Sequence, residues 1–172
     1  HVYIGGRMMD EDYIVDGLYT NPNIPNEEGD DVLTDQNFGY DIYYGGRGKD
    51  TLIGGNGDEL MLGGSGDDIL IGALGADNLR GGLGNDSYSV DNVGDIVTEN
   101  SNQGIDDVSS AITYTLPANV ENLVLTGTSP INGTGNDLDN LIIGDIFANQ
   151  LNGGSGNDTL NGHAGNDTLN GG

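Results

Sequence analysis

Acidic side chains recur at a fixed interval in this chain. Asp50, Asp68, Asp77 and Asp86 each stand at the sixth position of a nine-residue unit, where one further unit has Glu59. Glycine holds the first and fourth positions of these units, where it permits positive backbone angles and leaves carbonyl oxygens unshielded. Carboxylate and carbonyl oxygens are the hard ligands of which Ca²⁺ takes about six to eight. The spacing therefore predicts cation-binding loops, with calcium as the first ligand to consider.

A short strand must follow each loop and hold it in place. Burying one apolar side chain contributes roughly 1.5 to 3 kcal/mol, whereas ordering the backbone of each residue costs about 1 to 2 kcal/mol. We therefore expect metal to supply the stability that so thin a core lacks. The inward side chains are one per unit, at the eighth position: Leu52, Met61, Leu70, Leu79 and Tyr88.

The unit Gly-Gly-x-Gly-x-Asp-x-apolar-x resembles the repeat of RTX (repeat-in-toxin, hemolysin-type) proteins, which bacteria secrete. Residues 36–89 resemble one RTX array and residues 135–172 a second, looser one. The resemblance implies an all-β fold, a right-handed parallel β-roll or β-solenoid with calcium-binding loops between short strands. It also implies that two units make one coil and that several Ca²⁺ ions each lie between a loop and the equivalent loop one coil later.

The resemblance also implies the ligands. The acids are Asp31, Asp50, Asp68 and Asp86 on one edge of the roll, Asp41, Glu59 and Asp77 on the other, and Asp158 and Asp167 in the second array. The loop backbone positions are Gly45, Arg47, Gly48, Gly54, Asn56, Gly57, Gly63, Ser65, Gly66, Gly72, Leu74, Gly75, Gly81, Leu83 and Gly84. We expect weaker or lost sites where the pattern departs, at Glu59, at Ala73 and at Gln36–Asn37.

Residues 90–134 have a different texture but retain strand patterns. The alternation from Val108 to Leu116 predicts one half-buried strand that ends before Pro117, and residues 95–99 predict a shorter strand. The acids of this segment could form a further calcium site or a solvated surface, and the sequence leaves both open. They are Asp91, Asp95, Glu99, Asp106 and Asp107.

Asparagine replaces aspartate toward the second array. Counting back in nines from that array reaches Asn149, Asn140 and, two units earlier, Asn122. An amide can donate and accept hydrogen bonds in a stacked ladder but brings no charge to a cation. We therefore expect the solenoid to continue here without strong calcium sites, and Asp158 and Asp167 to be only partly loaded.

The charge of the chain agrees with a cation ligand. There are 28 acidic residues against four basic ones, a formal net charge of −24, which disfavours nucleic acid and anionic membranes as partners. Acids stacked in neighbouring loops repel each other, so a metal that binds only the native state promotes folding. The sequence predicts a chain that is disordered at very low calcium and folded at the millimolar levels found outside cells.

Other readings of the sequence fit less well. A flexible linker would not keep Asp and an apolar residue in phase, collagen needs glycine at every third position, and no EF-hand spacing occurs. The chain has no cysteine, no His-Glu-x-x-His motif and no Gly-x-Ser-x-Gly motif, so we expect no catalysis. His163 is interpreted as a tolerated substitution in a loop position normally held by glycine.

We predict four segments. Residues 1–35 are a capping segment with a degenerate repeat, in which Val2–Ile4 and 13–15 are candidate strands. Residues 36–89 form the first β-roll, 90–134 a β-rich insert that continues the solenoid, and 135–172 the second repeat block.

The predicted role is that of a non-catalytic, extracellular calcium-binding module for folding and secretion in a larger protein. The alternatives are a surface-layer, sheath or filament subunit that stacks on itself end to end, and the accessory repeat of a secreted hydrolase or epimerase. The chain contains no run of 18 apolar residues, so the sequence predicts no membrane insertion. Without a signal peptide or the C-terminal signal of type I secretion, we expect the chain to be part of a longer protein.

Overall fold

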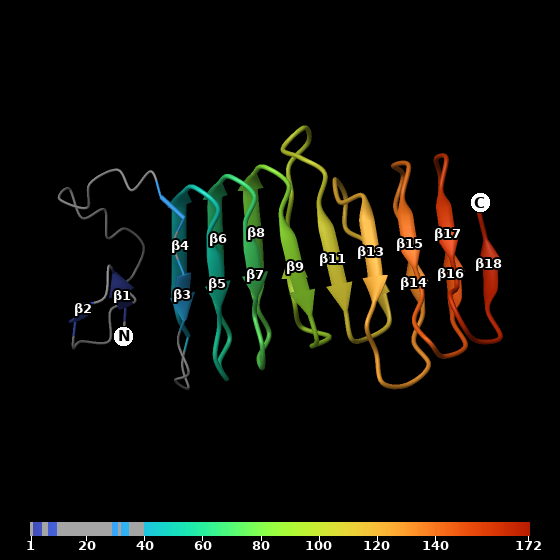
Figure 1. Cartoon of the computed structure of the whole chain (residues 1–172), viewed down its shortest axis with the longest axis horizontal. Helices are drawn as coiled ribbons and strands as arrows, with labels where there is room; N and C mark the ends of the chain where they lie inside the picture. Colours follow the sequence, from blue (N-terminus) through green and yellow to red (C-terminus); the bar gives the residue numbers. More distant parts are fainter. Residues whose placement is uncertain (1, 5–6, 10–28, 31, 35–39) are drawn as a thin grey trace.

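The computed structural model describes residues 2–4, 7–9, 29–30, 32–34 and 40–172 of the chain. Short strands stack side by side along the long axis of the molecule (Figure 1). A small antiparallel pair, β1 (Val2–Ile4) and β2 (Arg7–Met9), precedes the stack. The candidate strand at 13–15 lies outside the described residues. Within the described ranges, no helix has the length and apolar character needed to cross a membrane.

One long parallel sheet runs through the whole stack. Its neighbouring strands come from every second unit of the sequence, so each connection passes over the opposite face before returning. In spatial order the strands are β3 (Val32–Thr34), β5 (Thr51–Ile53), β7 (Ile69–Ile71), β9 (Ser87–Val90), β11 (Asp107–Ser110), β13 (Asn122–Leu125), β15 (Leu141–Ile143) and β17 (Thr159–Asn161).

Two shorter parallel sheets share the opposite face. The first opposing sheet contains β4 (Ile42–Arg47), β6 (Leu60–Ser65), β8 (Asn78–Leu83) and β10 (Ile96–Val97). The second opposing sheet contains β12 (Tyr114–Thr115), β14 (Gly133–Thr134), β16 (Gln150–Asn152) and β18 (Thr168–Asn170). This arrangement confirms the predicted all-β parallel solenoid.

The core consists of two rows of side chains, one from each of the facing sheets. Leu52, Met61, Leu70 and Leu79 are fully buried, and Tyr88 nearly so, as their eighth positions predict. The core continues through the insert and the second array with Val108, Leu123, Ile142 and Leu151. Each inward residue pairs with its equivalent one coil away, Leu52 with Leu70 and Leu70 with Tyr88.

The insert keeps the sheet but changes the coil length. Tyr88 pairs with Val108, and Val108 pairs with Leu123, so the 18-residue period of the first array is lost at both steps. The single strand predicted from Val108 to Leu116 is wrong. The chain turns after β11, where the Ser110 hydroxyl donates to the Ile112 carbonyl at 2.9 Å, and continues as β12 in another sheet. Such local serine bonds compete with an extended strand.

Candidate metal centre

One edge of the first array carries a continuous ladder of aspartates. The backbone N–H of Asp50 donates to Asp68 Oδ1, that of Asp68 to Asp86 Oδ1, and that of Asp86 to Asp106 Oδ1, each at 2.8 Å. All four side chains are buried. The structure thus brings together Asp50, Asp68 and Asp86, the acids expected on this edge.

The opposite edge carries a second ladder. The N–H of Glu59 donates to Asp77 Oδ1 at 2.8 Å, and that of Asp77 to Asp95 Oδ1 at 3.1 Å. Asp41 lies one coil earlier, where its carbonyl accepts the Leu60 N–H at 2.8 Å. Glu59 fits into the ladder despite its longer side chain, and Asp95 extends the row beyond the first array.

Each ladder uses only one oxygen of its carboxylates. Asp68 Oδ2, Asp77 Oδ2, Asp86 Oδ2 and Glu59 Oε1 are buried and accept no hydrogen bond. Buried polar atoms are nearly always satisfied, so a row of such oxygens indicates a missing electropositive partner.

The first-position glycines leave room for that partner. A Cβ placed on Gly63 would lie 2.4 Å from Asp68 Oδ2 and 2.7 Å from the Gly81 carbonyl oxygen of the next coil. A carboxylate oxygen and a carbonyl oxygen from successive coils thus converge on one small space. This donor set is the one that Ca²⁺ prefers.

The fourth-position glycines allow the loops to stack. Gly66 has φ +125°, and a Cβ on it would lie 1.8 Å from the Gly48 carbonyl oxygen one coil earlier. Two third-position carbonyls, those of Ser65 and Leu83, accept the N–H groups of Gly48 and Gly66 at 2.9 and 2.6 Å. A carbonyl has two lone pairs, so these oxygens keep the capacity to bind a metal.

The ladders hold negative charge away from water. Burial raises the pKa of Glu59 to about 8, and the nearby Asp77 carboxylate adds to the rise. Burial likewise raises the pKa of Asp86 to about 7 and that of Asp68 to about 6, although backbone N–H groups partly oppose both shifts. These buried carboxylates therefore bind protons more tightly than exposed carboxylates do.

A comparison with protein families identifies the repeat. The model of the RTX calcium-binding nonapeptide repeat matches in four copies, over residues 37–70, 53–88 and 143–172. This chain carries RTX calcium-binding nonapeptide repeats. The RTX β-roll is a structural calcium-binding fold and is generally non-catalytic. Neither the curated proteins nor the solved structures gave a match to the chain.

The RTX stack begins before the first matched residue. β3 pairs with β5, and the Lys49 N–H donates to Asp30 Oδ1 at 2.8 Å, so the degenerate unit near residue 30 stacks on the first full loop. Asp31 and the Gln36–Asn37 pair lie outside the described residues, and metal binding by Asp31 stays a prediction.

In the second RTX array an amide lies across the coil boundary from each acid. The N–H groups of Asn140 and Asn149 donate to Asp158 Oδ1 and Asp167 Oδ1 at 2.9 and 3.0 Å. The side-chain amide of Asn140 donates to the Glu121 carbonyl at 3.0 Å, and that of Asn149 to the Ile131 carbonyl at 2.6 Å. These N–H groups stabilise carbonyl oxygens without any ion.

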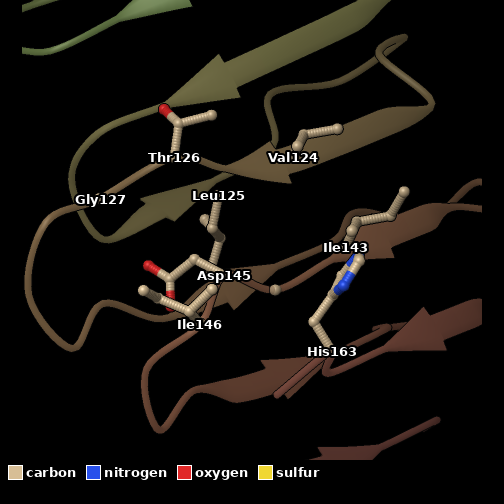
Figure 2. A pocket seen from close by; sticks show the side chains of 9 residues that line it. Val124, Leu125, Thr126, Gly127, Ile143, Asp145, Ile146 and His163 are labelled. Atoms are coloured by element: carbon tan, nitrogen blue, oxygen red, sulfur yellow. The ribbon is translucent and has the colours of Figure 1, made fainter. Parts of the chain in front are cut away.

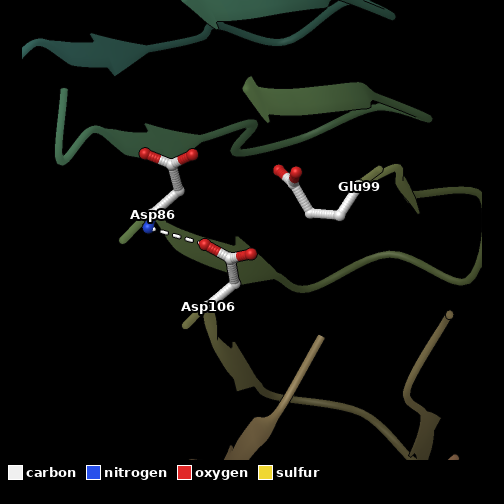
Figure 3. A group of neighbouring side chains, drawn as sticks. All are labelled: Asp86, Glu99 and Asp106. Carbon is white, nitrogen blue, oxygen red and sulfur yellow. Dashed lines mark hydrogen bonds between the residues drawn. The ribbon is translucent and has the colours of Figure 1, made fainter. Parts of the chain in front are cut away.

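The structure divides the five acids of the insert. Glu99 and Asp106 come together with Asp86 on one edge (Figure 3). Asp95 lies on the other edge, where its Oδ2 accepts the Asp91 N–H at 3.1 Å. Asp107 is exposed and accepts a bond from the Asn122 amide at 2.7 Å. The five acids therefore do not form one common site.

Sequence reasoning missed the continuation of both ladders. Asp95 lies 18 residues after Asp77, so the period itself could have placed it on that edge. Asp106 lies 20 residues after Asp86, so this coil is two residues longer than the 18-residue coil of the first array. No period in the sequence therefore predicts its position.

An open pocket lies on the C-terminal half of the stack (Figure 2). Its walls are mostly apolar, with Val124, Leu125 and Ile143 on the long sheet and His163 at the rim. None of the predicted metal ligands lines it. His163 has φ +59°, so this residue occupies a backbone conformation that favours glycine.

Proposed function

We propose that this chain is a non-catalytic, extracellular calcium-binding module whose first RTX array folds when it binds Ca²⁺. The observation that carries the proposal is the row of buried carboxylate oxygens without hydrogen-bond partners, among them Asp68 Oδ2, Asp77 Oδ2 and Asp86 Oδ2. Asp68 Oδ2 shares a small space with the Gly81 carbonyl oxygen, and each of the three acids lies one coil from another carboxylate. A divalent cation between successive loops would satisfy both kinds of oxygen and neutralise a pair of acids.

The residues that would hold the ions follow the two edges. On one edge the pairs are Asp50 with Asp68 and Asp68 with Asp86, and on the other edge Glu59 with Asp77. Carbonyls of the flanking loops would complete each shell. Bound calcium would supply positive charge, while the chain supplies the oxygen ligands from loops that stack at the correct spacing in the folded state.

The same geometry argues for folding on export. Without an ion, the acids of successive coils repel each other, and the thin apolar core offers little stabilisation to offset this repulsion. Calcium that binds only the native state shifts the equilibrium toward folding. RTX repeats are typical of secreted bacterial proteins, and calcium outside the cell is far higher than inside. The module would stay open during transport and fold after it.

A calcium titration of chelated protein tests this function. We expect far-ultraviolet circular dichroism to show a transition from coil to β-structure while light scattering reports constant size. A fold that is complete without calcium would overturn the proposal. Growth in size along with the transition would favour the self-assembling subunit instead.

Calorimetry of two aspartate variants tests the assignment of sites. Asp68 has an aspartate one coil away in both directions, whereas Asp167 meets Asn149. We expect Asp68→Ala to lose more bound Ca²⁺ than Asp167→Ala. Equal losses would contradict the placement of ions between successive coils.

A further inference from the structure

Three carboxylates converge where the first array meets the insert. Asp86 ends the first array, Glu99 follows β10, and Asp106 precedes β11. Their side chains are 0%, 7% and 1% exposed, and one oxygen from each lies within 4.8 Å of the others. Figure 3 shows the three side chains directed toward a common space.

Glu99 occupies a position that the repeat reserves for glycine. It stands 18 residues after Gly81, the first residue of a unit. Its carboxylate extends back over the preceding coil, where Oε1 accepts the N–H groups of Gly81 and Gly82 at 3.2 and 3.3 Å.

Tyr88 fixes the Glu99 carboxylate from the core side. The Tyr88 hydroxyl donates to Glu99 Oε1 and accepts the Gly81 N–H at 2.7 Å. One oxygen of Glu99 is thus held by three donors. Because Tyr88 is also a core residue, the position of this oxygen is set by the packing of the roll.

Two other oxygens of the cluster have no donor. Glu99 Oε2 and Asp86 Oδ2 are buried and accept no hydrogen bond. Asp106 contributes a third carboxylate, and the charged groups that act most on Asp86 are Asp68, Asp106 and Glu99, all acidic. Two buried, unsatisfied oxygens directed at a third carboxylate indicate a bound cation rather than a solvated acidic surface.

We propose that Asp86, Glu99 and Asp106 form a three-carboxylate calcium site that binds more tightly than the two-carboxylate sites inside the array. Ca²⁺ lies about 2.3 to 2.6 Å from its oxygen ligands, so two ligands of one ion can be up to about 5 Å apart. One oxygen from each of the three carboxylates lies within 4.8 Å of the others, which fits this limit. A third charge raises affinity, since charge count tunes calcium sites. The proposal rests on calcium binding by the array and adds Glu99 as a ligand outside the repeat.

Terbium luminescence of the whole chain, with Tb³⁺ as the probe for the calcium site, tests this proposal. The chain has no tryptophan, so tyrosine is the sensitiser, and the Tyr88 hydroxyl touches Glu99. We expect Glu99→Gln to weaken the first, tightest binding phase at least tenfold and leave the later phases in place. Asp137→Asn, which removes one exposed charge from the C-terminal half, should bind as the parent chain does.

Each outcome separates the two proposals. Binding of no Ca²⁺ or Tb³⁺ by the parent chain would overturn the proposed function itself. An unchanged first phase in Glu99→Gln, with the later phases present, would overturn only the three-carboxylate site. Should Glu99→Gln fail to fold, Tyr88→Phe decides the matter, because it keeps all three carboxylates. We expect a several-fold loss of emission from the first ion, and undiminished emission would place that ion elsewhere.

Discussion

The two RTX arrays have the same backbone ladder but different chemistry between coils. In the first array, Asp68 lies between Asp50 and Asp86, so acid meets acid at every coil boundary of that edge. In the second array, Asp158 meets Asn140, whose amide donates to the Glu121 carbonyl. The comparison teaches that an amide can bridge a coil boundary by itself, whereas the facing acids of the first array leave buried oxygens without a donor, for which we propose a cation.

The two kinds of coil boundary differ in whether they require an ion from the solvent. Two unit charges about 4 Å apart repel by about 4 kcal/mol at an effective dielectric constant near 20. A hydrogen bond such as that from the Asn140 amide contributes about 1 kcal/mol and depends on no ion. Asp158 Oδ2 of the second array is also buried without a hydrogen bond, so we expect the first array to depend on calcium more than the second, not exclusively. Four predictions test this difference.

Removing calcium should have the largest effect. Calcium at about a hundred times its Kd stabilises the state that binds it by about 2.7 kcal/mol per site, and we propose several such sites in the first array. Hydrogen exchange after chelation should show loss of protection in β5, β6 and β7, while β15 and β16 retain most of theirs. Equal loss in both arrays would end the distinction between them.

A change of pH should have the next largest effect on the metal-free protein. Burial raises the pKa of Glu59 to about 8 and that of Asp86 to about 7, from about 4 in the unfolded chain. The native state therefore holds more protons between these limits, so its stability is greatest below about pH 4 and falls as the pH rises toward 8.

Far-ultraviolet circular dichroism of the metal-free chain between pH 8 and pH 5 measures this effect. The β-structure of the first array should increase as the pH falls, and Glu59→Gln should reduce this change with pH. Asn140 and Asn149 do not titrate, so exchange protection in β15 and β16 should change less. β-Structure that decreases as the pH falls over this range would contradict the prediction.

Asn140→Asp should make one coil boundary of the second array resemble the boundaries of the first array, where acid meets acid. Asn140 is 2% exposed, and its amide donates to the carbonyls of Glu121 and Val120 at 3.0 and 3.3 Å. The variant places a buried carboxylate against these carbonyls, which should lower the free energy of unfolding by about 3 kcal/mol without calcium.

Calcium should restore part of the loss in Asn140→Asp, as urea unfolding with and without calcium would show. Asn166→Asp adds the same charge at an exposed residue and is the matched control. A loss that calcium does not reduce would mean that the amide boundary lacks the geometry of a cation site.

His163→Gly should have the smallest effect, a gain in the free energy of unfolding. His163 has φ +59°, a conformation that costs a residue other than glycine about 1 kcal/mol. His163→Gly should raise the free energy of unfolding by about this amount, measured by urea unfolding at saturating calcium. Ala164→Gly, at a residue without positive φ, should give no gain. A loss in His163→Gly would mean that the imidazole stabilises the pocket that it lines.

Much of the fold follows from the sequence because the repeat is regular. Inward side chains such as Leu52 and Leu70 stand at the same position of units 18 residues apart, and β-strand pairing in register makes them stack. The row from Asp50 to Asp86 follows from the same period. The prediction of one strand from Val108 to Leu116 was wrong, because the alternation of apolar and polar residues does not reveal the turn made by Ser110.

The sequence by itself determined the solenoid, the phase of its loops and the exchange of aspartate for asparagine between the arrays, since each depends on a period of nine. Only the tertiary structure decided that Glu99 turns back to Asp86, that Asp106 joins them, and that the opposing face consists of two sheets. Those outcomes depend on loops that depart from the period, where stacking on the previous coil, rather than residue spacing, sets the direction of each side chain.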